Sequence, residues 1–139
     1  MRQFPAVLVL GPRQCGKTTL LRNTVSGSYF DLEKPSDFQA FETDVEFALR
    51  ESKPPVILDE AQAAPAVFPV LRALIDEDPS RKGRFLISGS VDPSLVKQLS
   101  ESLAGRVGIL DLSPFLYPEV AARLKLPDFW LRGGFPDAC

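Results

Sequence analysis

Eight residues near the start of the chain have the types and spacing that bind phosphate. Residues 11–18 read GPRQCGKT and match the pattern G-x-x-x-x-G-K-[ST] at every constrained position. Glycines let backbone N–H groups close around anionic oxygens, and the free amides of a helix N-terminus add to the attraction. Lys17 is expected to reach the β- and γ-phosphates, and the Thr18 hydroxyl to ligate Mg²⁺. The sequence therefore predicts a nucleotide-binding chain.

The loop and the residue after it form the predicted nucleotide-binding set. Its members are Gly11, Pro12, Arg13, Gln14, Cys15, Gly16, Lys17, Thr18 and Thr19. Cys15 is either a thiol activated by the surrounding amides or, more simply, a small residue that fills the loop.

Two carboxylates follow a second apolar run, residues 56–58. Phosphoryl transfer needs a metal ion on the phosphate oxygens and a group that orients or deprotonates the attacking water. Asp59, at the end of a strand beside the loop, is expected to hold Mg²⁺ through water. Glu60 is expected to be the catalytic base. The alternative is an ordinary strand exit with acidic side chains in solvent.

Two further positions could complete a catalytic site. The segment 85–90 is a strand that ends in hydroxyls, so Ser88 or Ser90 could contact the γ-phosphate or the attacking water, or simply cap the next helix. Arg106 follows Gly105 at a helix end and is either an arginine finger or a cation that complements the helix dipole. The predicted catalytic residues are Glu60, Lys17, Arg106 and Ser88, with Thr18 and Asp59 on the metal.

Composition excludes several classes of protein. The 139 residues are enough for one domain, and a net charge of −2 gives no basic field that would indicate nucleic acid, although it does not exclude such a partner. No apolar stretch approaches the ~20 residues that span a bilayer. The chain has no histidine and two cysteines, so catalysis must use other groups and a disulfide framework is not expected. We expect a cytoplasmic protein.

The order of apolar and amphipathic segments predicts an α/β fold with a five-stranded parallel sheet and helices on both faces. With the phosphate-binding loop at residues 11–18, this is the expected three-layer fold of a P-loop NTPase. Strands are expected over 6–10, 29–32, 56–59, 84–88 and 107–110. Helices are expected over about 17–25, as one helix from 36–37 through 49, over about 66–76, and from an Asp92-Pro93 cap through Leu103. Residues 1–112 form the predicted ATPase core. Residues 113–139 form a proline-interrupted region with short helices over 117–124 and 127–131.

These features, in this order, resemble the AAA+/STAND-like ATPases of the additional-strand, catalytic-glutamate division, and more closely one prokaryotic AAA-type family. The matching segments are 11–20, 29–33, 58–62, 68–76, 84–90, 101–106 and 133–136. The resemblance implies Mg²⁺-dependent ATP hydrolysis, and a fourth strand between the strands that carry the loop and Asp59. Family members usually continue into a winged-helix region and a further C-terminal domain. The chain is therefore expected to be the ATPase core of a longer protein, with that missing domain as a partner.

Three functions compete at this point. The first is an ATPase whose cycle drives a conformational or assembly switch, and a possible homo-oligomer if Arg106 acts on a neighbour. The second is a small-molecule kinase, although the arginine-rich lid of such enzymes is not visible. The third is a nucleotide-dependent binding module with negligible turnover. ATP is favoured over GTP because the guanine-reading N-K-x-D pattern does not occur.

Overall fold

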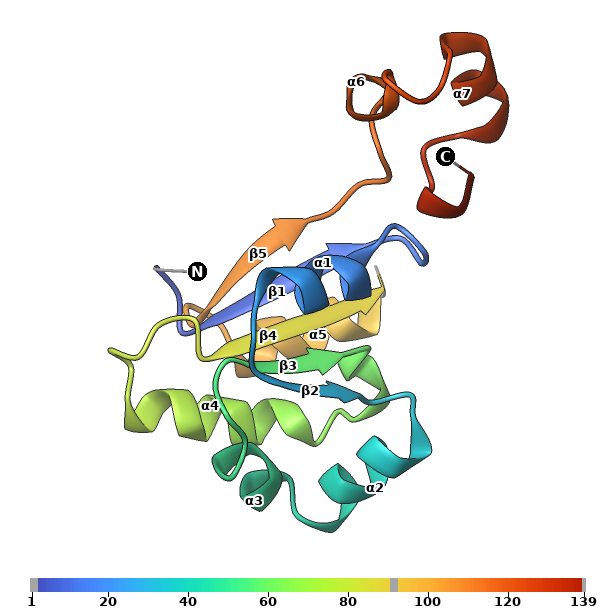
Figure 1. The fold of residues 1–139 in the computed structure, drawn as a ribbon. Coiled ribbons are helices and arrows are strands. Elements are labelled where there is room, and N and C mark those ends of the chain that lie inside the picture. Colours follow the sequence, from blue (N-terminus) through green and yellow to red (C-terminus); the bar gives the residue numbers. More distant parts are fainter. Residues whose placement is uncertain (1–2, 91–92, 139) are drawn as a thin grey trace.

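A five-stranded parallel sheet organises the chain. The structure is a computed structural model that describes residues 3–90 and 93–138. The strands are β1 (Ala6–Gly11), β2 (Ser28–Asp31), β3 (Val56–Asp59), β4 (Phe85–Ser90) and β5 (Val107–Asp111). Their order is β2-β3-β4-β1-β5 (Figure 1). The fourth strand was expected between the strand that leads to the phosphate loop and the strand that ends at Asp59. The order of β3, β4 and β1 confirms this position.

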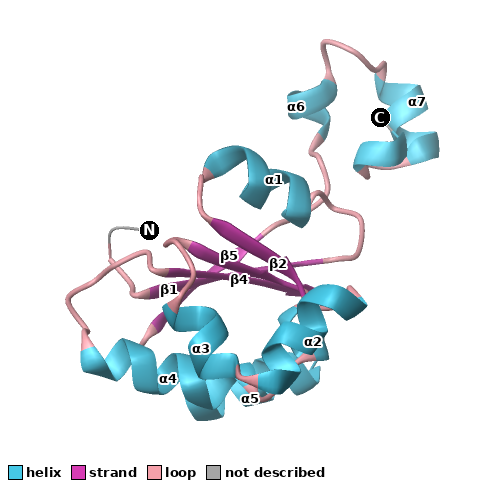
Figure 2. Cartoon of the chain, turned by 60° about the horizontal axis from the view of Figure 1, so that its bottom comes forward, coloured by secondary structure: helices cyan, strands magenta, loops and turns pink. Residues whose placement is uncertain are grey.

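Helices cover both faces of the sheet, but unequally. In Figure 2, α1 (Lys17–Thr24) lies on one face, and the helices between β2 and β5 lie on the other. These are α2 (Pro35–Thr43), α3 (Val45–Arg50), α4 (Val67–Glu77) and α5 (Pro93–Ser102). Among the described residues, no helix has the length and apolar character needed to cross a membrane.

The hydrophobic core follows this division into two clusters. The larger cluster lies between the sheet and α2–α5, and its largest buried side chains include Phe41, Phe68 and Phe85. The smaller cluster, below α1, contains Val9, Leu21, Ile57 and Leu86. On the α1 side, β5 and its neighbours border an apolar groove of about 710 Å³. Burial is therefore deepest on the four-helix face.

One predicted helix is wrong: the segment expected to run unbroken through residue 49 forms two helices, α2 and α3. Asp44 separates them with an extended backbone, φ −157° and ψ 95°. Its Oδ1 accepts the N–H of Phe47 at 2.9 Å, which caps α3. The break lets Phe41 and Leu49, one on each helix, both reach the core with 1% exposure. The cap therefore overrides the continuous hydrophobic spacing that favoured one helix.

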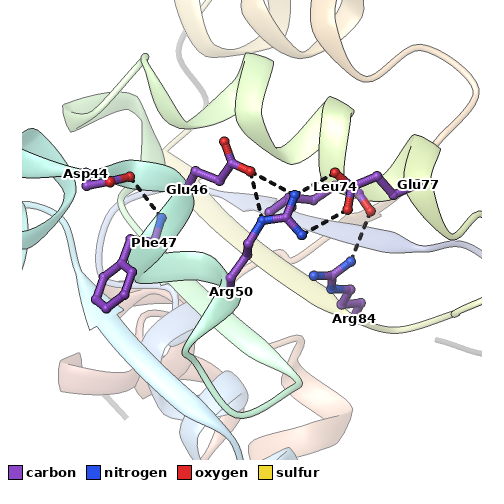
Figure 3. Close-up of polar contacts among 7 residues, drawn as sticks. All are labelled: Asp44, Glu46, Phe47, Arg50, Leu74, Glu77 and Arg84. Atoms are coloured by element: carbon purple, nitrogen blue, oxygen red, sulfur yellow. Dashed lines mark hydrogen bonds and ion pairs between the residues drawn. The ribbon is translucent and has the colours of Figure 1, made fainter.

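An exposed polar cluster joins α3 to α4 (Figure 3). The Arg50 guanidinium donates to Glu77 at 2.9 and 2.6 Å and to Glu46 at 2.8 Å. Arg84 donates to the carbonyl of Leu74 at 3.0 Å. Exposed ion pairs contribute little to stability, so the buried side chains rather than this cluster hold the domain together.

The remaining boundaries differ from the predicted ones by small amounts. The main extension is β4, which reaches Ser90 rather than ending at Ser88. Helix α5 ends at Ser102, and its expected cap, Asp92, lies outside the described residues. Helix α6 (Tyr117–Val120) is shorter than expected, and α7 (Leu126–Arg132) is slightly longer.

The C-terminal segment leaves the sheet after β5 and then returns toward it. Helices α6 and α7 lie beyond the end of β5, and the chain then folds back to a short 3-10 helix, η2 (Pro136–Ala138) (Figure 1). The N–H of Phe115 donates to the carbonyl of Gly134 at 2.6 Å, which ties the outgoing and returning stretches together. This return brings η2 toward the carboxyl end of β1.

Candidate functional site

The candidate site lies where the carboxyl ends of β1, β3 and β4 meet the N-terminus of α1. Gly11 is the last residue of β1, and Asp59 is the last residue of β3. Gly11 pairs in register with Ser90 of β4. Parallel strands bring their carboxyl ends to one edge of the sheet, and ligands of open α/β sheets bind there. The loop and the two carboxylates therefore meet at the expected edge.

The backbone of the loop is held by residues with unusual conformations. A Cβ on Gly11 would lie 2.4 Å from the carbonyl oxygen of Leu112, so only glycine fits where β1 enters the loop. Gly16 has φ 97°, a left-handed conformation that glycine adopts without strain, and directly precedes α1. Gln14 also has a positive φ, 63°. These turns place the first amides of α1 at the mouth of the loop.

Lys17 lies inside the loop. Its side chain is 4% exposed, and Nζ donates to the carbonyl oxygens of Gly11 at 3.0 Å and Pro12 at 2.9 Å. An ammonium has three N–H donors, so a third can serve an anionic oxygen. The loop carbonyls thus hold the positive charge in the position that a phosphate would approach.

Asp59 is the centre of a cluster of hydroxyl donors. It is 2% exposed, and its Oδ2 accepts from Thr18 Oγ1 and from the Tyr29 phenol, each at 2.6 Å. Ser88 Oγ donates to Oδ1. Burial alone would raise the pKa of Asp59, but the hydrogen bonds from Ser88, Thr18, Tyr29 and the Glu60 backbone hold it below its usual range. The carboxylate is therefore ionised although it is buried.

Tyr29 has the opposite shift. Burial, and then the hydrogen bond to the Asp59 carboxylate, raise the pKa of the phenol above its ordinary value. The phenol therefore keeps its proton and remains a donor to Asp59 across the physiological range. Sequence reasoning attached no role to Tyr29. The available signals were its place at the start of the matching segment 29–33 and on the strand that precedes the one ending in Asp59.

The donor set fits Mg²⁺. A threonine hydroxyl and a carboxylate are hard oxygen ligands, and Mg²⁺ is usually held by one or two carboxylates with waters and substrate phosphates. Thr18 and Asp59 already touch, which places both at one point beside the loop. Within the described part of the chain, no group of three or more His, Cys, Asp or Glu side chains could hold a metal. The residues therefore fit a metal shared with a nucleotide rather than one caged by protein.

Glu60 adopts a strained backbone next to the loop. Its φ of 52° is left-handed, which is uncommon for a residue with a side chain and recurs at functional sites. Gln62 Nε2 donates to Glu60 Oε2 at 2.6 Å, and Ser90 Oγ lies 3.5 Å from the same oxygen. Glu60 is thus oriented by side chains from η1 (Ala61–Ala63) and from the end of β4.

A cavity of about 220 Å³ brings these parts together. It is lined by the loop, by Glu60 and by the returning C-terminal segment: Gln14, Gly16, Lys17, Thr18, Thr19, Glu60, Pro136 and Asp137. The last two residues were not predicted as site residues. The sequence signal that could have found them is the segment 133–136, which reads GGFP. It was considered only as part of the family pattern.

The structure separates the two serines that sequence reasoning left as alternatives. Ser88 is fully buried and contacts Asp59, so it can influence the site only through that carboxylate. Ser90 lies one strand repeat further along, near Glu60. Of the two, only Ser90 is placed beside the carboxylate expected to act on water.

Arg106 is not brought into its own chain's site. Its carbonyl accepts the N–H of Ala6 at the start of β1, whereas the loop follows the other end of that strand. Six residues of strand separate the two ends by roughly 15–20 Å. The guanidinium instead pairs with Asp76 of α4, at 2.6 and 2.9 Å. This geometry gives no support to a finger acting within the same chain.

Two loop residues have surroundings that bear on their expected roles. Cys15 is 5% exposed and packs close to Gly11, which agrees with the filler interpretation rather than an accessible reactive thiol. Arg13 points outward, and its guanidinium lies 3.5 Å from Glu33 Oε1 in an exposed ion pair.

Comparison with known proteins identifies the family of the chain. A family model described as an AAA domain matches residues 3–121. Uncharacterized proteins of Mycobacterium bovis and Mycobacterium tuberculosis are each 43% identical to this chain over 139 residues. The match covers 98% of this chain and 31% of either relative, so the chain spans about a third of their length. The chain belongs to this family of AAA-type, P-loop ATPase-like domains.

Proposed function

We propose that the chain is a Mg²⁺-dependent ATPase domain that drives a conformational or assembly switch in a larger protein. The observation that carries the proposal is the contact between Thr18 and Asp59 beside the loop, with Glu60 lining the same cavity. In this proposal Asp59 serves the metal, and Glu60 lies next to the phosphate position. A site that only bound phosphate would not need both.

The residues divide the reaction among them. The loop amides and Lys17 would bind the β- and γ-phosphates, and Thr18 would hold the metal through its oxygen while its hydroxyl hydrogen donates to Asp59. Mg²⁺, when bound, supplies charge neutralisation on the phosphate oxygens. Glu60 would orient a water and accept its proton as the water oxygen bonds to the γ-phosphorus. The bond to the bridging oxygen then breaks and leaves ADP and phosphate.

One contact favours a second candidate, a nucleotide-dependent binding module with negligible turnover. Gln62 Nε2 donates to one oxygen of Glu60 at 2.6 Å, so an amide rather than a water occupies that position on the carboxylate. If Gln62 never releases Glu60, the site would bind nucleotide without hydrolysing it. The two candidates differ in turnover and not in binding.

The substitution Glu60→Gln tests the assignment. We expect it to bind a fluorescent ATP analogue within about twofold of the unsubstituted chain and to lose roughly 10²–10⁴-fold in phosphate release. Glu51→Gln, an exposed carboxylate at the end of α3, is the matched control and should retain full turnover. Equal turnover in Glu60→Gln would remove the catalytic role of Glu60.

Lys17→Ala tests nucleotide binding itself. Losing charge-assisted contacts worth ~1.5–3 kcal/mol each should weaken ATP affinity by well over tenfold. A chain that binds no nucleotide with Lys17 in place would refute the proposal altogether. Binding without any phosphate release would select the second candidate.

The partners follow from the same proposal. The curated relatives carry about two-thirds of their length outside the matched region, so we propose that the moving part belongs to a larger polypeptide. Because Arg106 lies far from its own site, we propose that it completes the site of a neighbouring copy in a homo-oligomer. Because a phosphate-binding loop implies an ATP-rich compartment, we propose a cytoplasmic location.

A further inference from the structure

We propose that Tyr29 is a positioning residue for the metal side of the site: its phenol fixes Asp59 so that Thr18 offers its oxygen to Mg²⁺. The inference rests on the proposed function, because it concerns a metal that arrives with the nucleotide. Tyr29 itself lies on β2 and does not line the nucleotide cavity, so its action would be indirect.

The geometry places two hydroxyl donors on one carboxylate oxygen. Tyr29 and Thr18 each donate to Asp59 Oδ2 at 2.6 Å, whereas Ser88 donates to Oδ1. The two donors to Oδ2 come from different elements, β2 and α1. The carboxylate therefore cannot rotate without breaking one of these bonds.

This arrangement decides which way Thr18 faces. A carboxylate has about four lone-pair sites, and Tyr29, Thr18, Ser88 and the Glu60 N–H account for them. Because the Thr18 hydroxyl donates its hydrogen bond to Oδ2, the lone pairs of the Thr18 oxygen point away from the carboxylate. Without the phenol, Oδ2 would have a free site that could take a water or bind the metal directly. The orientation of Thr18 would then no longer be fixed.

The ring of Tyr29 is itself held by the helix that carries Thr18. The Arg22 guanidinium lies over the ring, 4.1 Å from its centroid, in a cation–π contact. Thr18 and Arg22 are four residues apart on α1 and therefore share one helix face. A single face of α1 thus contacts Asp59 through Thr18 and Tyr29 through Arg22. The phenol, the carboxylate and α1 are therefore each in contact with the other two.

The test is the magnesium dependence of nucleotide binding, which a purely structural tyrosine would not change. A fluorescent ATP analogue is titrated with Mg²⁺ and, separately, bound in excess EDTA. We expect Tyr29→Phe to raise the Mg²⁺ midpoint about tenfold, as outer-shell partners of metal ligands do, and to change affinity in EDTA by less than about twofold. Tyr117→Phe is the matched control: it removes the phenol of the only other tyrosine, which packs on Phe129 in α6–α7, and should match the unsubstituted chain.

Arg22→Gln gives a second reading that keeps the phenol but removes the charge over its ring. We expect a smaller shift of the Mg²⁺ midpoint in the same direction. The role of Tyr29 would be overturned if the Mg²⁺ midpoint is unchanged in both variants, or if the affinity for the analogue falls equally with and without Mg²⁺. Either result would leave the ATPase proposal intact. If the unsubstituted chain binds the analogue with no dependence on Mg²⁺, the proposed function fails, and the inference fails with it.

Discussion

Replacing Ser88 by alanine isolates one hydrogen bond to a buried charge. Ser88 is fully buried, and its hydroxyl donates to Asp59, which is 2% exposed. The substitution removes a single oxygen from a strand position and leaves the backbone ladder of β4 unchanged. The cavity it creates is small, so the loss of stability should come from the carboxylate.

The magnitude follows from the burial of both partners. A hydrogen bond to a charged group contributes about 1.5–3 kcal/mol, and an exposed pair would be discounted for solvent screening. Here solvent is excluded, so the full range applies. For a domain of this size, that loss corresponds to a fall in melting temperature of roughly 5–12 °C. The remaining donors, Thr18 and Tyr29, keep Asp59 ionised and the fold intact.

The assay is urea denaturation at pH 7, with Ser90→Ala as the control. Ser90 belongs to the same strand, but its hydroxyl lies 3.5 Å from Glu60 in a half-buried position, so its removal should cost little stability. A double-mutant cycle that combines Ser88→Ala with Asp59→Asn measures the interaction energy between these two side chains. The reasoning would be refuted if the two serine variants lose equal free energy of unfolding. It would also be refuted if the losses from Ser88→Ala and Asp59→Asn are strictly additive in the double variant.

Two further predictions concern Asp59 and Arg106. The pKa of Asp59 is lower in the folded chain than its ordinary value. The contribution of the ionised carboxylate to the free energy of unfolding is therefore full above about pH 4 and is lost as the pH falls through the folded pKa. In urea titrations between pH 7 and pH 3, the stability gap between the unsubstituted chain and Asp59→Asn should narrow toward low pH, and a constant gap would contradict this linkage. If Arg106 acts on a neighbour, ATPase activity per chain should rise with protein concentration and Arg106→Ala should abolish the rise. Asp76→Asn removes the ion pair but keeps Arg106, so the same loss in that variant would indicate a structural effect instead.

The sequence was most informative where one local pattern determines one local structure. The loop pattern predicts a strand, a turn and a helix at fixed offsets, and β1 and α1 occupy those places. The run that ends at Asp59 gave β3 with its predicted bounds, residues 56–59. These positions were predictable because parallel strands must bring their carboxyl ends to one edge of the sheet.

The sequence was least informative where two distant segments meet. Tyr29 precedes Asp59 by thirty positions, and nothing in the spacing shows that its phenol reaches that carboxylate. The sequence left Ser88 and Ser90 as alternatives. They share one face of β4, and their two-residue offset along the strand brings Ser88 to Asp59 and Ser90 toward Glu60. The return of Pro136 to the cavity depends on how the chain turns after β5, which local propensity does not determine.

The choice of partners around Asp59 explains how the carboxylate can be both buried and useful. A lysine or arginine beside it would stabilise the charge but also cancel it, and a metal would then gain little by approaching. Hydroxyls and an amide stabilise the charge by hydrogen bonds and leave it uncancelled. The nearby cation, Lys17, instead turns to the carbonyls of Gly11 and Pro12. The site therefore keeps its negative charge at the end of β3 and its positive charge in the loop, as a magnesium–triphosphate requires.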